Sequence, residues 1–179
     1  MTEIPTLRTA RLVLRAFHAS DAPAVQSYAS DKAIAATTLN IPHPYTLEMA
    51  EEWIGTHQEA FDTGQAIQLA IALSDLGKLI GAIGLNIKPA HERAEVGYWI
   101  GKPHWGKGYC TEAVMAVVQY GFDSLGFERI FATHFRKNPA SGRVMQKAGM
   151  KYEGRLRHHV MKWGEFNDLE VYSLLRSRR

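Results

Sequence analysis

The sequence predicts one domain of mixed α/β structure, on three observations. The chain has 179 residues, the usual length of a single domain and enough to bury about 70% of the surface that the unfolded chain exposes. Hydrophobic residues make up 46% and charged residues 22%, as in ordinary globular proteins. Strand-like alternating runs are interspersed with runs of helical period. We therefore place a single domain at residues 8–179.

A strand and two helices open the predicted domain. The run Arg11–Phe17 is rich in strand-forming residues. Residues 22–30 have a helical pattern, and Ser20 is the candidate residue to cap this helix. A second helix is predicted over residues 47–63, with Thr46 as its candidate cap.

Strands dominate the rest of the chain. Six are predicted, over residues 65–73, 78–85, 93–100, 129–135, 151–160 and 169–175. The connection at residues 74–77 predicts a hairpin with a longer loop, and Trp163-Gly164 lies between the last two strands. Helices are predicted over residues 108–125 and 140–148.

Charge and cysteine content argue against several classes of protein. Lys and Arg number 21 and Asp and Glu 18, so the net charge is only +3 and forms no basic stripe for nucleic acid. The single cysteine, Cys110, cannot form an internal disulfide. No apolar leader opens the chain and no apolar run reaches 18 residues. We expect a cytoplasmic protein with no nucleic-acid or membrane partner.

The most informative segment is the glycine-rich turn at residues 101–111, between a predicted strand and a predicted helix. A helix N-terminus offers unpaired N–H groups and partial positive charge. Gly106 and Gly108 would let the backbone approach an anion without a Cβ in the way. A phosphorylated ligand is therefore expected.

Known phosphate-loop patterns fit these residues incompletely. Gly101-x4-Gly106-Lys107 matches most of a Walker A sequence, but Gly108 stands where a Ser or Thr would hold magnesium. A dinucleotide loop needs a third glycine where Thr111 stands. The remaining pattern, two glycines opening a helix, is also compatible with a plain strand-to-helix turn.

The wider sequence resembles a known family. The run Ala94–Val114 is similar to the acetyl-CoA signature of GNAT N-acetyltransferases, and in particular to the RimJ/RimL-like branch, named for enzymes that acetylate ribosomal-protein N-termini. Three further segments agree in order: Thr9–Arg15, Asn138–Met150 and Gly154–Val160. The resemblance implies an α/β fold whose mixed, mostly antiparallel sheet is flanked by helices and splays between its fourth and fifth strands. It also implies acetyl-CoA as co-substrate and an amine as acceptor.

The resemblance assigns residues to the CoA moiety. Backbone groups around the turn would bind its pyrophosphate, at Trp105, Gly106, Lys107, Gly108, Tyr109, Cys110 and Thr111. The preceding strand would pair with the pantetheine arm through Tyr98, Trp99 and Ile100. Asn138 and Ser141 would meet the arm near the thioester. Pro103 stands where the family often has Gln or Arg, so a side-chain contact is lost there.

Acetyl transfer to an amine needs an uncharged amine, hydrogen-bond donors for the oxyanion and a proton for the departing thiolate. Glu95 is the candidate base, since it lies on the strand beside the cofactor; a salt bridge to Arg93 is its alternative role. A backbone N–H within residues 96–98 is the candidate oxyanion donor.

The candidate acid is Ser141. Many family members carry a tyrosine in the helix after the asparagine, but Met145 occupies that region here. The alternative role of Ser141 is to order Asn138 at the start of the helix. A covalent role for Cys110 is not expected, because the family passes the acetyl group directly. His158-His159 lacks a third ligand, so no metal site is predicted.

Several functions stay open at this point. The preferred one is an acetyl-CoA-dependent N-acetyltransferase that acetylates a primary amine by direct attack in a ternary complex, with a protein N-terminus as one option for the acceptor. The others are acetylation of a small amine (a polyamine, an amino acid or an aminoglycoside), acyl-CoA sensing without turnover, and nucleotide binding. The acceptor groove is expected in variable loops such as Asn40–Tyr45, and Lys107 and Arg143 are expected to face the cofactor phosphates. A homodimer is one option for the assembly.

Overall fold

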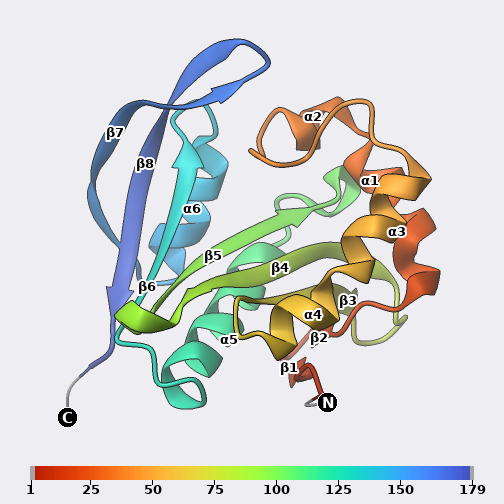
Figure 1. Ribbon diagram of the computed structural model, residues 1–179, viewed down its shortest axis with the longest axis horizontal. Helices are drawn as coiled ribbons and strands as arrows, with labels where there is room; N and C mark the ends of the chain where they lie inside the picture. Colours follow the sequence, from red (N-terminus) through yellow and green to blue (C-terminus); the bar gives the residue numbers. More distant parts are fainter. Residues whose placement is uncertain (1–2, 178–179) are drawn as a thin grey trace.

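The computed structural model describes residues 3–177, which form a sheet of eight strands with helices on both faces (Figure 1). The strands are β1 (Leu7–Arg8), β2 (Leu12–Arg15), β3 (Ala66–Leu73), β4 (Leu79–Lys88), β5 (Arg93–Ile100), β6 (Arg129–Phe135), β7 (Lys151–Lys162) and β8 (Glu165–Leu175). The helices are α1 (Ala22–Ala29), α2 (Lys32–Ala35), α3 (Leu47–Gly55), α4 (His57–Asp62), α5 (Tyr109–Asp123) and α6 (Pro139–Lys147). Short 3-10 turns lie at Ala19–Asp21, Pro89–His91 and Lys102–His104. None of the helices within residues 3–177 combines the length and the apolar character needed to cross a bilayer.

The sheet splays at one place, between β5 and β6. Its order is β1-β2-β3-β4-β5-β6-β8-β7, and every neighbouring pair is antiparallel except β5 and β6. That parallel pairing covers only Arg93–Glu95 against Arg129–Phe131, after which the strands diverge. Counted from β2, the opening lies between the fourth and fifth strands, so the predicted splay is confirmed.

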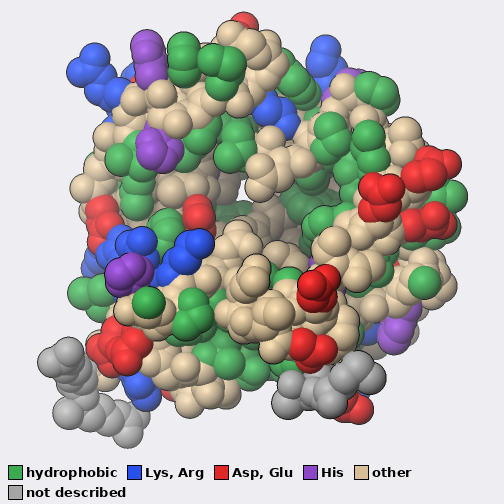
Figure 2. Space-filling view, in the orientation of Figure 1, with side chains coloured by type: hydrophobic (Ala, Val, Ile, Leu, Met, Phe, Trp, Pro, Cys, Tyr) green, Lys and Arg blue, Asp and Glu red, His purple; other side chains and the backbone are tan. Residues whose placement is uncertain are grey.

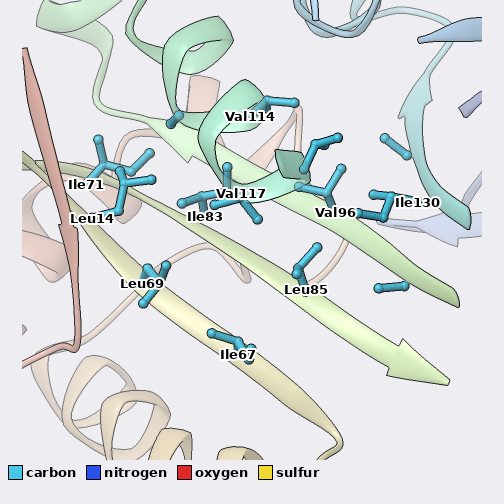
Figure 3. Close-up of a cluster of buried hydrophobic side chains, with 14 of the residues drawn as sticks. Leu14, Ile67, Leu69, Ile71, Ile83, Leu85, Val96, Val114, Val117 and Ile130 are labelled. Atoms are coloured by element: carbon cyan, nitrogen blue, oxygen red, sulfur yellow. The ribbon is translucent and has the colours of Figure 1, made fainter. Parts of the chain in front are cut away.

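Two apolar clusters hold the layers together. The larger one joins α5 to the sheet, and Figure 3 shows Val114 and Val117 of the helix with Leu14, Ile83 and Val96 of three strands. Burying an aliphatic side chain of this size contributes about 1.5–3 kcal/mol. The smaller cluster packs α1 and α3 on the opposite face. Helix α5 is thereby fixed with its N-terminus beside the end of β5.

Two local predictions about helices are wrong. The helix expected over residues 47–63 is two helices, because Thr56 ends α3: its hydroxyl donates to the Trp53 carbonyl at 2.7 Å and its N–H donates to the same group. Ser20 lies within a 3-10 turn and does not cap α1, which is preceded by Asp21. Thr46 is confirmed as the cap of α3, since its hydroxyl accepts from the Met49 N–H at 3.3 Å.

Candidate active site

The turn between β5 and α5 depends on glycines at three positions. A Cβ at Gly101 would lie 2.4 Å from the Tyr28 ring, so only glycine lets this ring pack against the start of the turn. Gly106 and Gly108 have φ values of +75° and +81°, in the left-handed region that other residues rarely adopt. Gly108 is the residue that precedes the first turn of α5. At Gly106 and Gly108, therefore, no side chain covers the backbone that leads into the N-terminus of α5.

The N–H groups of residues 106–111 donate to no other described residue. Those of the first three residues of α5 have no intrahelical acceptor, and they lie at the positive end of a helix of 15 residues. Nothing lies within 4 Å of the position that a Cβ on Gly106 would occupy. The N–H of Trp105 differs, since it donates to the Lys102 carbonyl at 3.2 Å. The turn thus fits a pyrophosphate held by several amides.

A clamp from the N-terminal hairpin holds this turn, and sequence reasoning missed it. The Arg11 guanidinium donates to the Glu112 carboxylate at 2.7 Å and to the Lys107 carbonyl at 3.0 Å. The Thr9 hydroxyl donates to the same carboxylate at 2.7 Å. Partial burial alone would raise the pKa of Glu112, but the hydrogen bonds from Thr9 and Arg11 outweigh it, and the pKa lies below its ordinary value. Residues 9–15 matched the family pattern, yet their contact with α5 spans about 100 positions in the chain.

The opening of the sheet exposes backbone groups of β5. The Gly101 N–H donates to the Ile80 carbonyl of β4 at 2.8 Å, so the odd-numbered residues of β5 direct their peptide groups toward β4. The even-numbered residues Val96 and Tyr98 direct theirs into the opening, whereas the Ile100 carbonyl accepts a hydrogen bond of 2.6 Å from the Trp105 indole N–H. Of the strand residues predicted to pair with the pantetheine arm, Trp99 is thus turned the wrong way for a backbone contact.

Glu95 lies at the point where β5 and β6 part. Its carboxylate accepts a hydrogen bond of 2.9 Å from the Thr133 hydroxyl of β6, a partner that sequence reasoning missed. Arg93 makes no ion pair with Glu95 among the described residues; its guanidinium lies 5.7 Å from the Phe131 ring. Thr133 thereby orients the carboxylate at the mouth of the splay.

Ser141 pairs with Tyr98 across the opening. Their hydroxyl oxygens are 2.9 Å apart, and the Tyr98 hydroxyl donates to the Ser141 carbonyl at 3.0 Å, which leaves the serine hydroxyl to donate to Tyr98. Burial raises the pKa of Tyr98 well above its ordinary value, so the phenol stays protonated. Asn138 precedes α6 without using its side chain as a cap. Met145 is fully buried in the core.

One cavity of about 1000 Å³ connects these features. It forms the hollow at the centre of the face in Figure 2. All the predicted site residues except Lys107 line it. Its cofactor end lies between β5, α5 and α6 and includes the cations Arg143 and Lys147. Its acceptor end lies between Glu95, residues 37–42 and α3.

The remaining candidates contribute little chemistry. Cys110 is nearly buried, and burial raises the pKa of its thiol to about 12, so it stays protonated. His158 stacks on Phe166, with ring centroids 5.7 Å apart. Within residues 3–177, no three His, Cys, Asp or Glu side chains are grouped so that they could hold a metal ion.

A splayed mixed sheet with a glycine turn at a helix N-terminus is the arrangement that the resemblance to acetyl-CoA-dependent transferases implies, and comparison with known proteins agrees. Residues 11–151 match the acetyltransferase (GNAT) domain, so the chain belongs to the GNAT family. It is 35% identical over 175 residues to the uncharacterized N-acetyltransferase YoaA of Bacillus subtilis (strain 168), covering 97% of this chain and 98% of that protein. The chain is an acetyl-CoA-dependent N-acetyltransferase.

Relatives that act on ribosomal proteins are also found, in agreement with the RimJ/RimL-like resemblance. The ribosomal-protein-serine acetyltransferase of Escherichia coli (strain K12) is 27% identical over 139 residues, 71% of this chain and 78% of that protein. The solved structure of RimL, a ribosomal L7/L12 alpha-N-protein acetyltransferase in complex with coenzyme A, superposes with a TM-score of 0.88 at 19% identity. That match covers 96% of this chain and 98% of RimL.

Proposed function

We propose that the protein transfers the acetyl group of acetyl-CoA to the primary amine of a protein N-terminus, by direct attack in a ternary complex. The single cavity carries this proposal, because it joins the open amides of residues 106–111 to the Glu95 carboxylate through the splay. Both substrates can therefore occupy the site together. The similarity to a ribosomal-protein-serine acetyltransferase supports a protein acceptor.

Glu95 is the proposed base. The amine must lose a proton to attack the thioester carbon, and a carboxylate at the edge of the cavity can take it directly or through water. The Thr133 hydroxyl occupies one carboxylate oxygen at 2.9 Å, and no described residue donates a hydrogen bond to the second. That second oxygen is the proposed proton acceptor.

Backbone and hydroxyl groups complete the proposed reaction. The N–H groups of Val96 and Tyr98, which face the opening, donate to the oxyanion as the C–N bond forms. Ser141 gives its proton to the sulfur as the C–S bond breaks. Solvent then returns a proton to Ser141 and takes the proton that Glu95 accepted, while the Tyr98 hydroxyl, 2.9 Å away, orients the serine hydroxyl. One proton thus leaves the amine and one reaches the thiolate.

A small-molecule amine is the second candidate acceptor. The acceptor end is walled by Tyr45, Trp53 and Trp99, and Tyr45 is buried. An enclosed apolar wall of this kind suits a compact ligand as well as a chain terminus. Thiol release from acetyl-CoA, measured with a panel of N-terminal peptides, polyamines, amino acids and aminoglycosides, decides between the two.

Glu95→Gln tests the proposed base. We expect kcat to fall by about 10²–10⁴-fold, because the amide cannot accept the proton, with acetyl-CoA affinity unchanged. Glu59→Gln is the matched control, since the exposed Glu59 carboxylate of α4 has no hydrogen-bond partner among the described residues. Wild-type turnover in Glu95→Gln would refute the assignment of Glu95 as the base. Tight acetyl-CoA binding with no turnover of any amine by the wild type would favour the alternative function, acyl-CoA sensing without catalysis.

A further inference from the structure

Lys162 lies at the tip of the β7–β8 hairpin and is buried although it is charged. It is the last residue of β7 and only 7% exposed. The hairpin turns through Trp163 and Gly164, whose φ values of +53° and +79° are those of a two-residue turn with both central residues in the left-handed region. The turn ends the strand and leaves the Lys162 side chain directed away from the hairpin, toward the rest of the molecule.

The Lys162 ammonium donates two hydrogen bonds to a segment more than 120 positions away. Its Nζ lies 3.0 Å from the Leu39 carbonyl oxygen and 2.6 Å from the Ile41 carbonyl oxygen. These carbonyls belong to the irregular connection between α2 and α3. In the described part of the chain, no other hydrogen bond reaches the backbone of residues 39–44.

The two partners stand on opposite sides of the splay. Residues 37–42 follow α2, which is packed on α1 beside the β1–β5 side of the sheet, and they line the acceptor end of the cavity. Lys162 belongs to the β6–β8 side. In Figure 1 the hairpin turn and the segment after α2 lie at the same end of the molecule, above the opening. The contact therefore spans the opening.

We propose that Lys162 is a positioning residue for the amine acceptor: it fixes residues 39–41 as a wall of the acceptor end by tying them to the opposite side of the splayed sheet. The expected effect on the acceptor KM rests on the proposed function. The expected effect on the order of residues 39–41 rests on geometry alone. This positioning role concerns the acceptor only, because the carbonyls that Lys162 bonds belong to residues that line the acceptor end and not the cofactor end.

The chemistry of the contact explains why a lysine is needed. An ammonium group can donate to two carbonyls at once, and each bond to a charged donor is stronger than a neutral one. The ammonium also lies 5.1 Å from the centroid of the Trp163 ring. Burial lowers the pKa of Lys162, with the charge of Lys137 acting in the same direction. Methionine has a similar length and no donor, so it removes the contact with little change in shape.

The test compares Lys162→Met with Lys151→Met, a control at the far, exposed end of the same strand. The rate at which a non-specific protease cuts the folded protein within residues 36–46 is measured first. We expect Lys162→Met to speed this cleavage at least tenfold and Lys151→Met to leave it unchanged. With the best amine from the panel, we expect Lys162→Met to raise the acceptor KM at least fivefold, with kcat and the acetyl-CoA KM within twofold of wild type. Lys162→Arg should restore part of both effects.

Two outcomes would overturn the proposal. One is unchanged cleavage within residues 36–46 of Lys162→Met; the other is faster cleavage with an unchanged acceptor KM. If the wild type turns over no amine, the proposed function fails, and the cleavage measurement still decides whether Lys162 holds the segment.

Discussion

The two ends of the cavity are built differently. The cofactor end is built around one continuous stretch, residues 101–111, which supplies the glycines, the open amides and the start of α5, and is completed by β5 and α6. The acceptor end is lined by three segments far apart in the chain, β5 at Glu95, residues 37–42 and α3, and Lys162 of the β7–β8 hairpin is bonded to the second of them. The comparison shows why cofactor chemistry can be inferred from local sequence and acceptor chemistry cannot.

Gly108→Val is expected to have the largest effect, and it should weaken the cofactor end while leaving the acceptor end unchanged. A β-branched residue at φ +81° costs about 1–2 kcal/mol, and its Cβ would lie 3.4 Å from the Arg11 guanidinium, so the turn and its amides would have to shift. We expect the acetyl-CoA Kd to rise at least about tenfold, the equivalent of 1.4 kcal/mol, in a calorimetric titration. The acceptor KM should not change, which is the reverse of the pattern expected for Lys162→Met.

Gly64→Val is the matched control for this strain. Gly64 has φ +68° and nothing within 4 Å of its Cβ position, and it lies outside the cavity lining. Both variants should lose similar stability, but only Gly108→Val should lose acetyl-CoA affinity. Equal acetyl-CoA affinity in the two variants would show that the turn does not hold the pyrophosphate.

A smaller effect is expected from Glu112→Gln, which weakens the clamp on the turn. The glutamine carbonyl oxygen can still accept from one side, but the negative charge and the second acceptor oxygen for Thr9 and Arg11 are lost, so the free energy of unfolding at pH 7 should fall by about 1–2 kcal/mol. The acetyl-CoA Kd should rise less than in Gly108→Val, because the glycines and amides of the turn remain. Denaturant unfolding with and without acetyl-CoA measures both.

The pH dependence of this variant gives a second check. The folded-state pKa of Glu112 lies below its ordinary value of 4.5, so its contribution is present above pH 4.5 and is lost as the pH falls through the folded pKa. The stability difference between wild type and Glu112→Gln should therefore shrink below about pH 4.5. A gap that stays constant down to pH 2 would contradict the assignment of the clamp to the ionised carboxylate.

Most of the fold could be predicted from the sequence, because its elements have clear local signals. The strands at Arg93–Ile100 and Arg129–Phe135 begin and end where their alternation predicts. The break at Thr56 could not be predicted, since the apolar spacing of a single long helix continues across it. There the hydroxyl bond to the Trp53 carbonyl decides the structure, and periodicity does not report it.

The candidate site likewise has one part that the local sequence predicts and one part that it does not. The glycines and helix N-terminus of the turn are local, so their role could be read from residue types. The contacts that orient Glu95 and Ser141 join residues 38 and 43 positions apart, on strands and helices whose pairing the residue pattern alone does not fix. Thr133 and Tyr98 are their partners because the splayed sheet and α6 bring them together in three dimensions.

The most direct test of the central claim is a crystal structure of the protein with coenzyme A. The expected result is a pyrophosphate within about 3 Å of the amides of residues 106–111, a pantetheine arm on the open edge of β5, and a thiol directed toward the space between Glu95 and Ser141. Coenzyme A bound elsewhere, or with its thiol pointing away from Glu95, would contradict a single cavity that brings the acetyl group to the amine.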